Sequence, residues 1–69
     1  MSARSRYEIK VVHDSIEVVD LDDGEVVLFW DCLPRERRRM SEALRADLVR
    51  LDPGAFMRRW SQARPEEFG

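Results

Sequence analysis

The sequence is poor in the residues that bind metals or cross-link a chain. Its 69 residues include one cysteine, Cys32, and one histidine, His13. A lone cysteine excludes an internal disulfide, and one cysteine with one histidine cannot supply the about four ligands of a structural zinc site. We therefore expect no metal and no cofactor. The missing disulfide framework also favours a cytoplasmic protein over a small secreted one.

Long apolar runs are missing as well. No stretch approaches the ~20 apolar residues that span a bilayer. The first ten residues, MSARSRYEIK, lack the apolar segment of a signal peptide. We expect no membrane association. The composition, 43% hydrophobic and 38% charged, is typical of one small globular domain in which most apolar residues must be buried.

Patterns that carry catalysis are also absent. There is no glycine-rich phosphate loop and no serine in a nucleophile motif. His13 lies beside Asp14 in an expected turn, where a solvated side chain is the simpler interpretation. Cys32 precedes an expected helix, but Asp31 disfavours a thiolate there, and free cysteines usually behave as small buried hydrophobic residues. We expect no enzymatic activity and no small-molecule substrate.

The densest acidic stretch is DLDDGE at 20–25. It has the acid content of a calcium loop but not the spacing, because its glycine falls at position 5 rather than 6. Asp23 and Gly24 instead separate two apolar runs, which is a strong signal for a β-hairpin turn.

The chain from Tyr7 to Asp31 alternates apolar and polar residues and is rich in β-branched side chains, which predicts three strands. The DG turn and a weaker turn at 13–15 make them an antiparallel meander. We expect an α+β fold, a three-stranded antiparallel β-meander followed by two α-helices packed on one face. The single α+β domain covers 7–64, with a flexible arm at 1–6 and a C-terminal tail at 65–69.

The two helices are signalled by prolines and by helical spacing. The first begins near Pro34 and reaches Leu51, and the second runs from Pro53 to about residue 63. Asp31 and Asp52 are the expected N-caps. The apolar residues expected on the inner sides of the helices are Leu33, Met40, Ala43, Leu44, Leu48, Leu51, Phe56, Trp60 and Ala63.

The register of the meander depends on the lengths of its turns. A two-residue turn at Asp23 and Gly24 sets Leu21 opposite Val26. For the first turn we choose three residues, 13–15, because this gathers most apolar side chains on one face. That face carries Tyr7, Ile9, Val11, Val19, Leu21, Val26, Leu28 and Trp30.

The opposite face then shows a second apolar patch. It consists of Val12, Val18, Val27 and Phe29. Because two short helices can cover only one face, this patch is predicted to bind a partner.

The two halves of the chain carry opposite charge. Residues 1–33 hold three basic and eight acidic residues, whereas 34–69 hold nine arginines and six acidic residues. Four arginines crowd the first turns of the first helix, where the positive helix end favours acids instead. They are Arg35, Arg37, Arg38 and Arg39.

Three explanations for this cluster remain open. The acidic strands could neutralise it internally, or an acidic protein or a second copy of the chain could bind it. The third is that nucleic-acid phosphates contact Arg35, Arg38, Arg39 and Arg45. Nucleic acid is the weaker choice, because the net charge is −2 and the aromatic residues are needed for the core. The sequence thus indicates a small non-catalytic interaction or regulatory module that self-associates, as in a homodimer, or docks to a protein partner. A nucleic-acid-associated regulator is the alternative.

Overall fold

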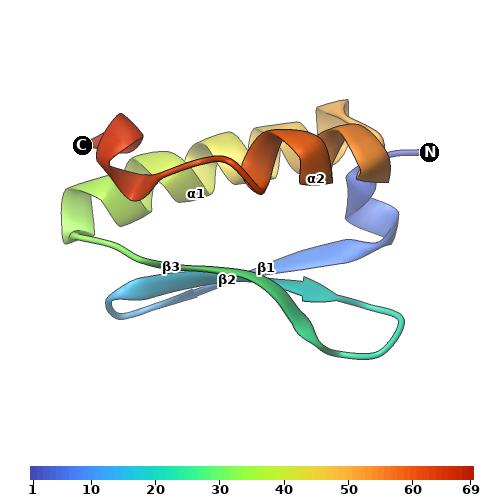
Figure 1. The fold of residues 1–69 in the computed structure, drawn as a ribbon, viewed down its shortest axis with the longest axis horizontal. Coiled ribbons are helices and arrows are strands. Elements are labelled where there is room, and N and C mark those ends of the chain that lie inside the picture. Colours follow the sequence, from blue (N-terminus) through green and yellow to red (C-terminus); the bar gives the residue numbers. More distant parts are fainter.

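The computed structural model describes all 69 residues as one sheet covered on one side by helices (Figure 1). In chain order the elements are the 3-10 helix η1 (Ala3–Ser5), β1 (Tyr7–Val12), β2 (Ser15–Asp20), β3 (Val26–Asp31), α1 (Pro34–Arg50), α2 (Pro53–Trp60) and the 3-10 helix η2 (Pro65–Phe68). The sheet order is β1-β2-β3, with both pairs antiparallel. The expected α+β meander with two following helices is confirmed. No helix is both long and apolar enough to cross a membrane.

Both helices begin at the prolines that the sequence indicates, although α2 ends earlier than expected, at Trp60. Asp52 is confirmed as the N-cap of α2, because its Oδ1 accepts the Ala55 N–H at 2.8 Å. Asp31 does not cap α1, because it is still the last residue of β3. The N-cap is Leu33, whose N–H donates to Glu36 Oε1 at 2.9 Å.

The core lies between the sheet and the helices and is dominated by aromatic rings. Tyr7, Phe56, Trp60 and Phe68 follow one another with centroid separations of 5.7, 6.3 and 5.6 Å, and Trp30 meets Trp60 edge-on at 6.2 Å. Large rings bury much apolar area per residue, which matters in a domain this small. The largest fully buried side chains are Trp60, Phe56, Ile16, Met40, Leu44 and Val18.

Both ends of the chain pack against the rest of the protein. Ala3 of η1 is fully buried, and its N–H donates to the Leu51 carbonyl at 2.7 Å. Phe68 of η2 stacks on Trp60. The sequence predicts a flexible arm at 1–6 and a tail at 65–69, because each segment contributes a single apolar anchor that no periodic pattern reveals.

The first turn contains two residues, not three, so that prediction was wrong. Val12 pairs with Ser15 and Ile9 pairs with Val18. A shift of one residue inverts a strand, so Val18 faces the helices and Glu17 faces the uncovered side. Together, the predicted three-residue first turn and two-residue second turn would have placed the Glu17 carboxylate on the covered face, opposite Trp30. Burying an unpaired charge costs more than exposing a valine.

The second hairpin is wider than predicted. Leu21 is not opposite Val26; instead Val26 pairs with Val19, and the register shifts between Val18 and Val19. The loop spans residues 21–25, and Gly24 has a φ of +74°, a conformation that glycine adopts without strain. The bulge turns Val26 to the uncovered face, where it is 49% exposed.

The uncovered face of the sheet therefore differs from the predicted patch. Val18 is sealed in the core and Val27 packs partly against it, so neither contributes to that face as predicted. Val12 and Phe29 are about half exposed, as is Val26. The register places three charged residues among them, namely Glu8, Lys10 and Glu17. The face is a mixture of apolar and charged side chains rather than a continuous apolar surface.

Candidate functional site: a groove beside strand β1

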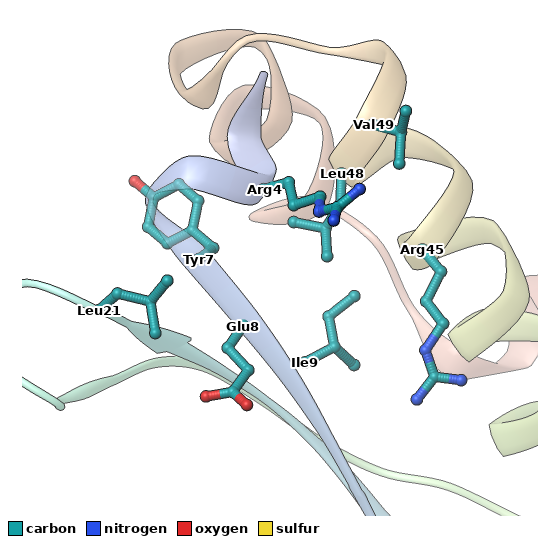
Figure 2. Close-up of a pocket in the computed structure, with 8 residues that line it drawn as sticks. All are labelled: Arg4, Tyr7, Glu8, Ile9, Leu21, Arg45, Leu48 and Val49. Carbon is teal, nitrogen blue, oxygen red and sulfur yellow. The ribbon is translucent and has the colours of Figure 1, made fainter. Parts of the chain in front are cut away.

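The larger of the two hollows in the surface is a groove of about 510 Å³ along β1 and α1 (Figure 2). Three consecutive residues of β1 line it, Tyr7, Glu8 and Ile9. Because successive strand side chains point to opposite faces, a hollow lined by all three must run along the edge of the strand. The full lining is Arg4, Tyr7, Glu8, Ile9, Leu21, Arg45, Leu48 and Val49.

The helix side of the groove follows from the spacing of residues on α1. Arg45, Leu48 and Val49 are three and four positions apart and so share one side of the helix. Leu48 belongs to the core, whereas Val49 is 61% exposed. Ile9 of β1 is partly buried against the same core. The floor of the groove is therefore an apolar extension of the core.

The borders of the groove are electropositive. Arg4 reaches it from η1 and Arg45 from α1, and Figure 2 shows the Arg4 guanidinium above Ile9 and the Arg45 guanidinium to its lower right in that view. Glu8 is the one acid in the lining. Neither arginine takes part in any of the four ion pairs of the protein, which are Arg6–Asp20, Arg6–Asp22, Arg50–Asp47 and Arg59–Asp47.

The arginines that open α1 form a separate surface. Arg35, Arg37 and Arg38 line a hollow of about 380 Å³ together with Pro34. None of the ion pairs involves them or Arg39. Figure 1 places the start of α1 and the 21–25 loop at opposite ends of the molecule. The acidic loop therefore does not neutralise this cluster, whereas Asp31 and Glu36 lie at the same end of the molecule as the arginines.

Helical spacing groups Arg45 with these arginines, but the fold places it in a different hollow. Arg45 lies seven residues beyond Arg38, about two helical turns, and borders the β1–α1 groove. The groove itself was not predicted, because Arg4, Ile9 and Arg45 are far apart in the sequence. Only the packing of η1 against the rest of the chain brings Arg4 to the other two.

No family model, no curated protein and no solved structure matches this chain. Its function has to be inferred from its side chains and surfaces.

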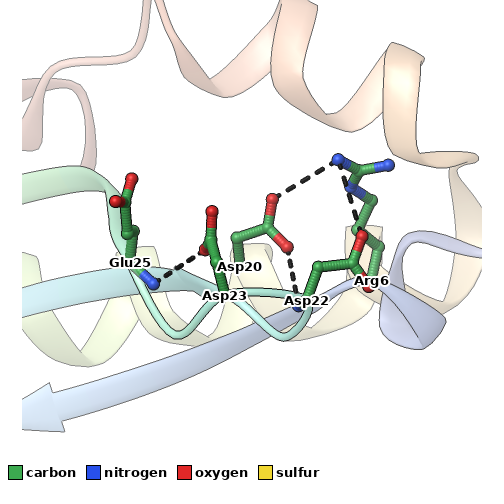
Figure 3. A network of polar contacts seen from close by, with 5 residues as sticks. All are labelled: Arg6, Asp20, Asp22, Asp23 and Glu25. Atoms are coloured by element: carbon green, nitrogen blue, oxygen red, sulfur yellow. Dashed lines mark hydrogen bonds and ion pairs between the residues drawn. The ribbon is translucent and has the colours of Figure 1, made fainter.

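The acidic loop between β2 and β3 is built by its own carboxylates (Figure 3). Asp20 Oδ1 accepts the Asp22 N–H, and Asp23 Oδ1 accepts the Glu25 N–H, both at 2.9 Å. Arg6 lies 3.4 Å from Asp20 and 4.0 Å from Asp22, and the charge of Asp20 is the main cause that raises the pKa of Arg6. Such local bonds are typical of aspartates that shape turns. No group of three or more side chains is arranged to hold a metal ion.

Asp47 is the most deeply buried acid, with 2% of its surface exposed. Its carboxylate accepts hydrogen bonds from Arg50 at 2.7 Å, from Arg59, and from Trp60 Nε1 at 3.0 Å. Burial acts to raise the pKa of Asp47, but the bonds from Arg50, Arg59 and Trp60 and the charge of Arg59 outweigh it and hold the pKa below its usual value. Asp47 therefore ties α1 to α2, and its carboxylate is engaged by donors from both helices.

Cys32 and His13 are two further side chains whose chemistry could matter. Cys32 is 7% exposed, and its burial, followed by the charges of Glu36 and Asp31, raises the pKa of the thiol. The thiol lies 3.7 Å from the Trp30 carbonyl. The thiol stays protonated, because burial disfavours the charged thiolate. His13 is exposed in the first turn. Neither forms a pair with an orienting partner, which general acid–base or nucleophilic catalysis requires.

Proposed function

We propose that this chain is a small, non-catalytic interaction module that docks to a protein partner through the β1–α1 groove. One observation carries the proposal: an apolar groove, open at a sheet edge, is bordered by Arg4 and Arg45, which have no ion-pair partners. The apolar floor favours burial of an apolar side chain, at roughly 25 cal/mol per Å². The arginines favour a carboxylate. The partner is thus a protein segment with apolar and acidic residues.

The uncovered sheet face supports docking less well. Its three half-exposed apolar residues, Val12, Val26 and Phe29, share that face with charged side chains. An effective interface core is apolar, tightly packed and depleted of charge. We therefore place the partner at the groove rather than at the sheet face, and we propose a partner protein rather than a second copy of the chain. The proposal includes a cytoplasmic location, supported by the free thiol of Cys32.

A nucleic-acid-associated regulator is the second candidate. It is favoured by the four arginines at the start of α1, which have no ion-pair partners. Two observations weigh against it. The net charge is −2, and most aromatic rings are committed to the core, so no stacking platform remains for bases.

Peptide selection on the immobilised full-length chain tests the proposal. A library of random peptides of about eight residues, the length of one strand, is panned against the protein. The enriched peptides and labelled single-stranded and duplex DNA are then titrated by fluorescence anisotropy at about 50 and 200 mM salt, a range over which phosphate binding weakens steeply. We expect enrichment of peptides that combine acidic and apolar residues.

Two charge reversals on the same helix locate the binding site. Arg45→Glu should weaken peptide binding at least about tenfold, a loss of ~1.4 kcal/mol. Arg38→Glu makes the same charge change outside the groove and should weaken binding no more than about twofold, through long-range electrostatics alone. Salt-sensitive DNA binding that Arg38→Glu abolishes, with no peptide enriched, would establish the second candidate instead.

A further inference from the structure

We infer that the groove captures its partner segment as a fourth strand, hydrogen-bonded to the outer edge of β1. This inference rests on the proposed function and specifies how the groove recognises its ligand. The inference depends on the backbone groups at the outer edge of β1, which the groove exposes, and on the side chains that line the groove.

The outer edge of β1 carries free backbone groups. The Leu21 N–H donates to the Arg6 carbonyl at 2.8 Å. In the same ladder, Glu8 pairs with Val19, Lys10 with Glu17 and Val12 with Ser15. In an antiparallel ladder, alternate residues of a strand bond to the same neighbour. The N–H and C=O groups of the intervening residues therefore point away from β2. These residues are Tyr7, Ile9 and Val11.

None of these outward groups bonds to another part of the protein. A row of free N–H and C=O groups is a template for an added strand. The sheet has a second outer edge at β3, but neither surface hollow lies along it. Only at β1 does a free edge coincide with a groove that side chains of a ligand can fill.

The side chains of the groove define the added strand. Alternate residues of that strand would face α1, about 6.6–6.8 Å apart. One meets the apolar floor of Ile9 and Leu48, and a neighbour on the same face meets Arg45 or Arg4. The ligand is therefore an extended segment with an apolar and an acidic residue two positions apart. Its carboxylate is that of aspartate or glutamate, because terminal carboxylates are captured by backbone N–H groups rather than by separate arginines.

A synthetic strand provides the probe. It is an acetylated, amidated peptide of about eight residues in which glutamate and valine alternate on one face and threonine fills the other. Two N-methylated versions are compared with it, each methylated at one of the two alternating sets of amides. Binding to the full-length chain is measured by anisotropy, and exchange of the Tyr7, Ile9 and Val11 amide hydrogens by NMR.

Strand addition predicts an asymmetric result. Methylation of the amides that face β1 should weaken binding at least about tenfold, since two or three hydrogen bonds are lost, whereas methylation of the other set should have little effect. The bound peptide should slow exchange at Ile9 and Val11. Arg45→Glu should weaken the unmodified peptide, and the matched Arg38→Glu should not.

Other outcomes overturn the inference in distinguishable ways. Equal binding of both methylated peptides would mean that the groove binds peptides without strand addition, and the proposed function would stand. Binding that requires a free terminal carboxylate would contradict the side-chain assignment. Protected Ile9 and Val11 amides in the chain alone, together with dimers in sedimentation, would identify a second copy as the occupant. If neither this probe nor any library peptide binds, the proposed function fails as well.

Discussion

Asp47 shows how a buried acid can act as a structural joint in a small domain. Its carboxylate is surrounded by hydrogen-bond donors from α1 and α2, so the charge is compensated where it is buried. Arg50 and Arg59 remain largely exposed on their outer sides. Removing the acid would therefore break bonds without leaving a buried charge unpaired.

Asp47→Asn should lower the free energy of unfolding by about 1.5–3 kcal/mol at neutral pH, the range for hydrogen bonds to charged groups. The pKa of folded Asp47 is below its unfolded value, which is about 3.9. Its stabilisation is therefore complete above pH 4 and is lost as the pH falls through the folded pKa. Urea unfolding should show a constant gap between wild type and variant from about pH 7 to 5, which narrows below about pH 4.

The matched control is Glu42→Gln, which changes an exposed acid of the same helix that has no ion-pair partner. It should leave the unfolding curves unchanged at every pH. A gap between wild type and Asp47→Asn that persists at low pH would contradict the assigned role.

Asp52 provides a second prediction at this scale. Asp52→Ala removes the side chain that accepts the Ala55 N–H at the start of α2. It should cost about 1 kcal/mol of stability. Asp52→Asn keeps a side-chain oxygen that can accept this hydrogen bond, so it should retain most of that stability. Equal melting temperatures for wild type and the alanine variant would mean that the cap contributes nothing in solution.

The elements differ in how well the sequence predicts them. The starts of α1 and α2 depend on local signals, a proline preceded by an extended residue, and they are found at Pro34 and Pro53. The register of β2 against β1 depends instead on whether the first turn contains two residues or three. A local pattern does not fix that number when both faces of a strand carry valines, as Val18 and Val19 do.

Threonine substitutions test the observed register. Val18→Thr places a hydroxyl in the core and should cost about 1–3 kcal/mol. Val26→Thr makes the same change on a half-exposed residue and should alter stability by less than about 0.5 kcal/mol. The register predicted from a three-residue first turn and a two-residue second turn gives the reverse order, because it places Val18 outside and Val26 inside. Thermal or urea unfolding of the two variants decides between them.

At the scale of the whole molecule, charge and apolar surface are distributed unevenly. The unpaired arginines at the start of α1 and the acidic loop lie at opposite ends of the molecule (Figure 1), and Leu21 of that loop lines the groove. The sequence predicts opposite charge on the two halves but cannot show that the acidic loop lies away from the arginines at the start of α1. Their separation leaves the arginines free to attract an anionic partner.

The uncovered sheet face gives a prediction at the same scale. Its charged residues interrupt the apolar ones, so we expect the chain to be monomeric at tens of micromolar, by sedimentation equilibrium. Phe29→Lys should leave that state unchanged. If wild type forms dimers that Phe29→Lys dissociates, the sheet face is a self-association surface, as the sequence analysis expected.

The candidate site was only partly accessible from the sequence. Arg45 was named as a candidate binding residue, but together with the arginines at the start of α1, because helical spacing shows which residues share a side of a helix and not what packs beside them. Arg4 and Ile9 were not, because their meeting with Arg45 requires the packing of η1 and the edge position of β1. Neither the packing of η1 nor the edge position of β1 can be recognised from the residues next to Arg4 or Ile9 in the sequence.

The sequence by itself determined the element types, their order and the starts of both helices, because strand alternation, helix spacing and proline signals act over a few neighbouring residues. Only the tertiary structure decided which face of β2 is buried, that the chain ends join the core, and that a groove with free backbone groups and two free arginines lies beside β1. Those features depend on contacts between residues distant in the chain, where burying an aromatic ring or keeping Glu17 in water outweighs local preference.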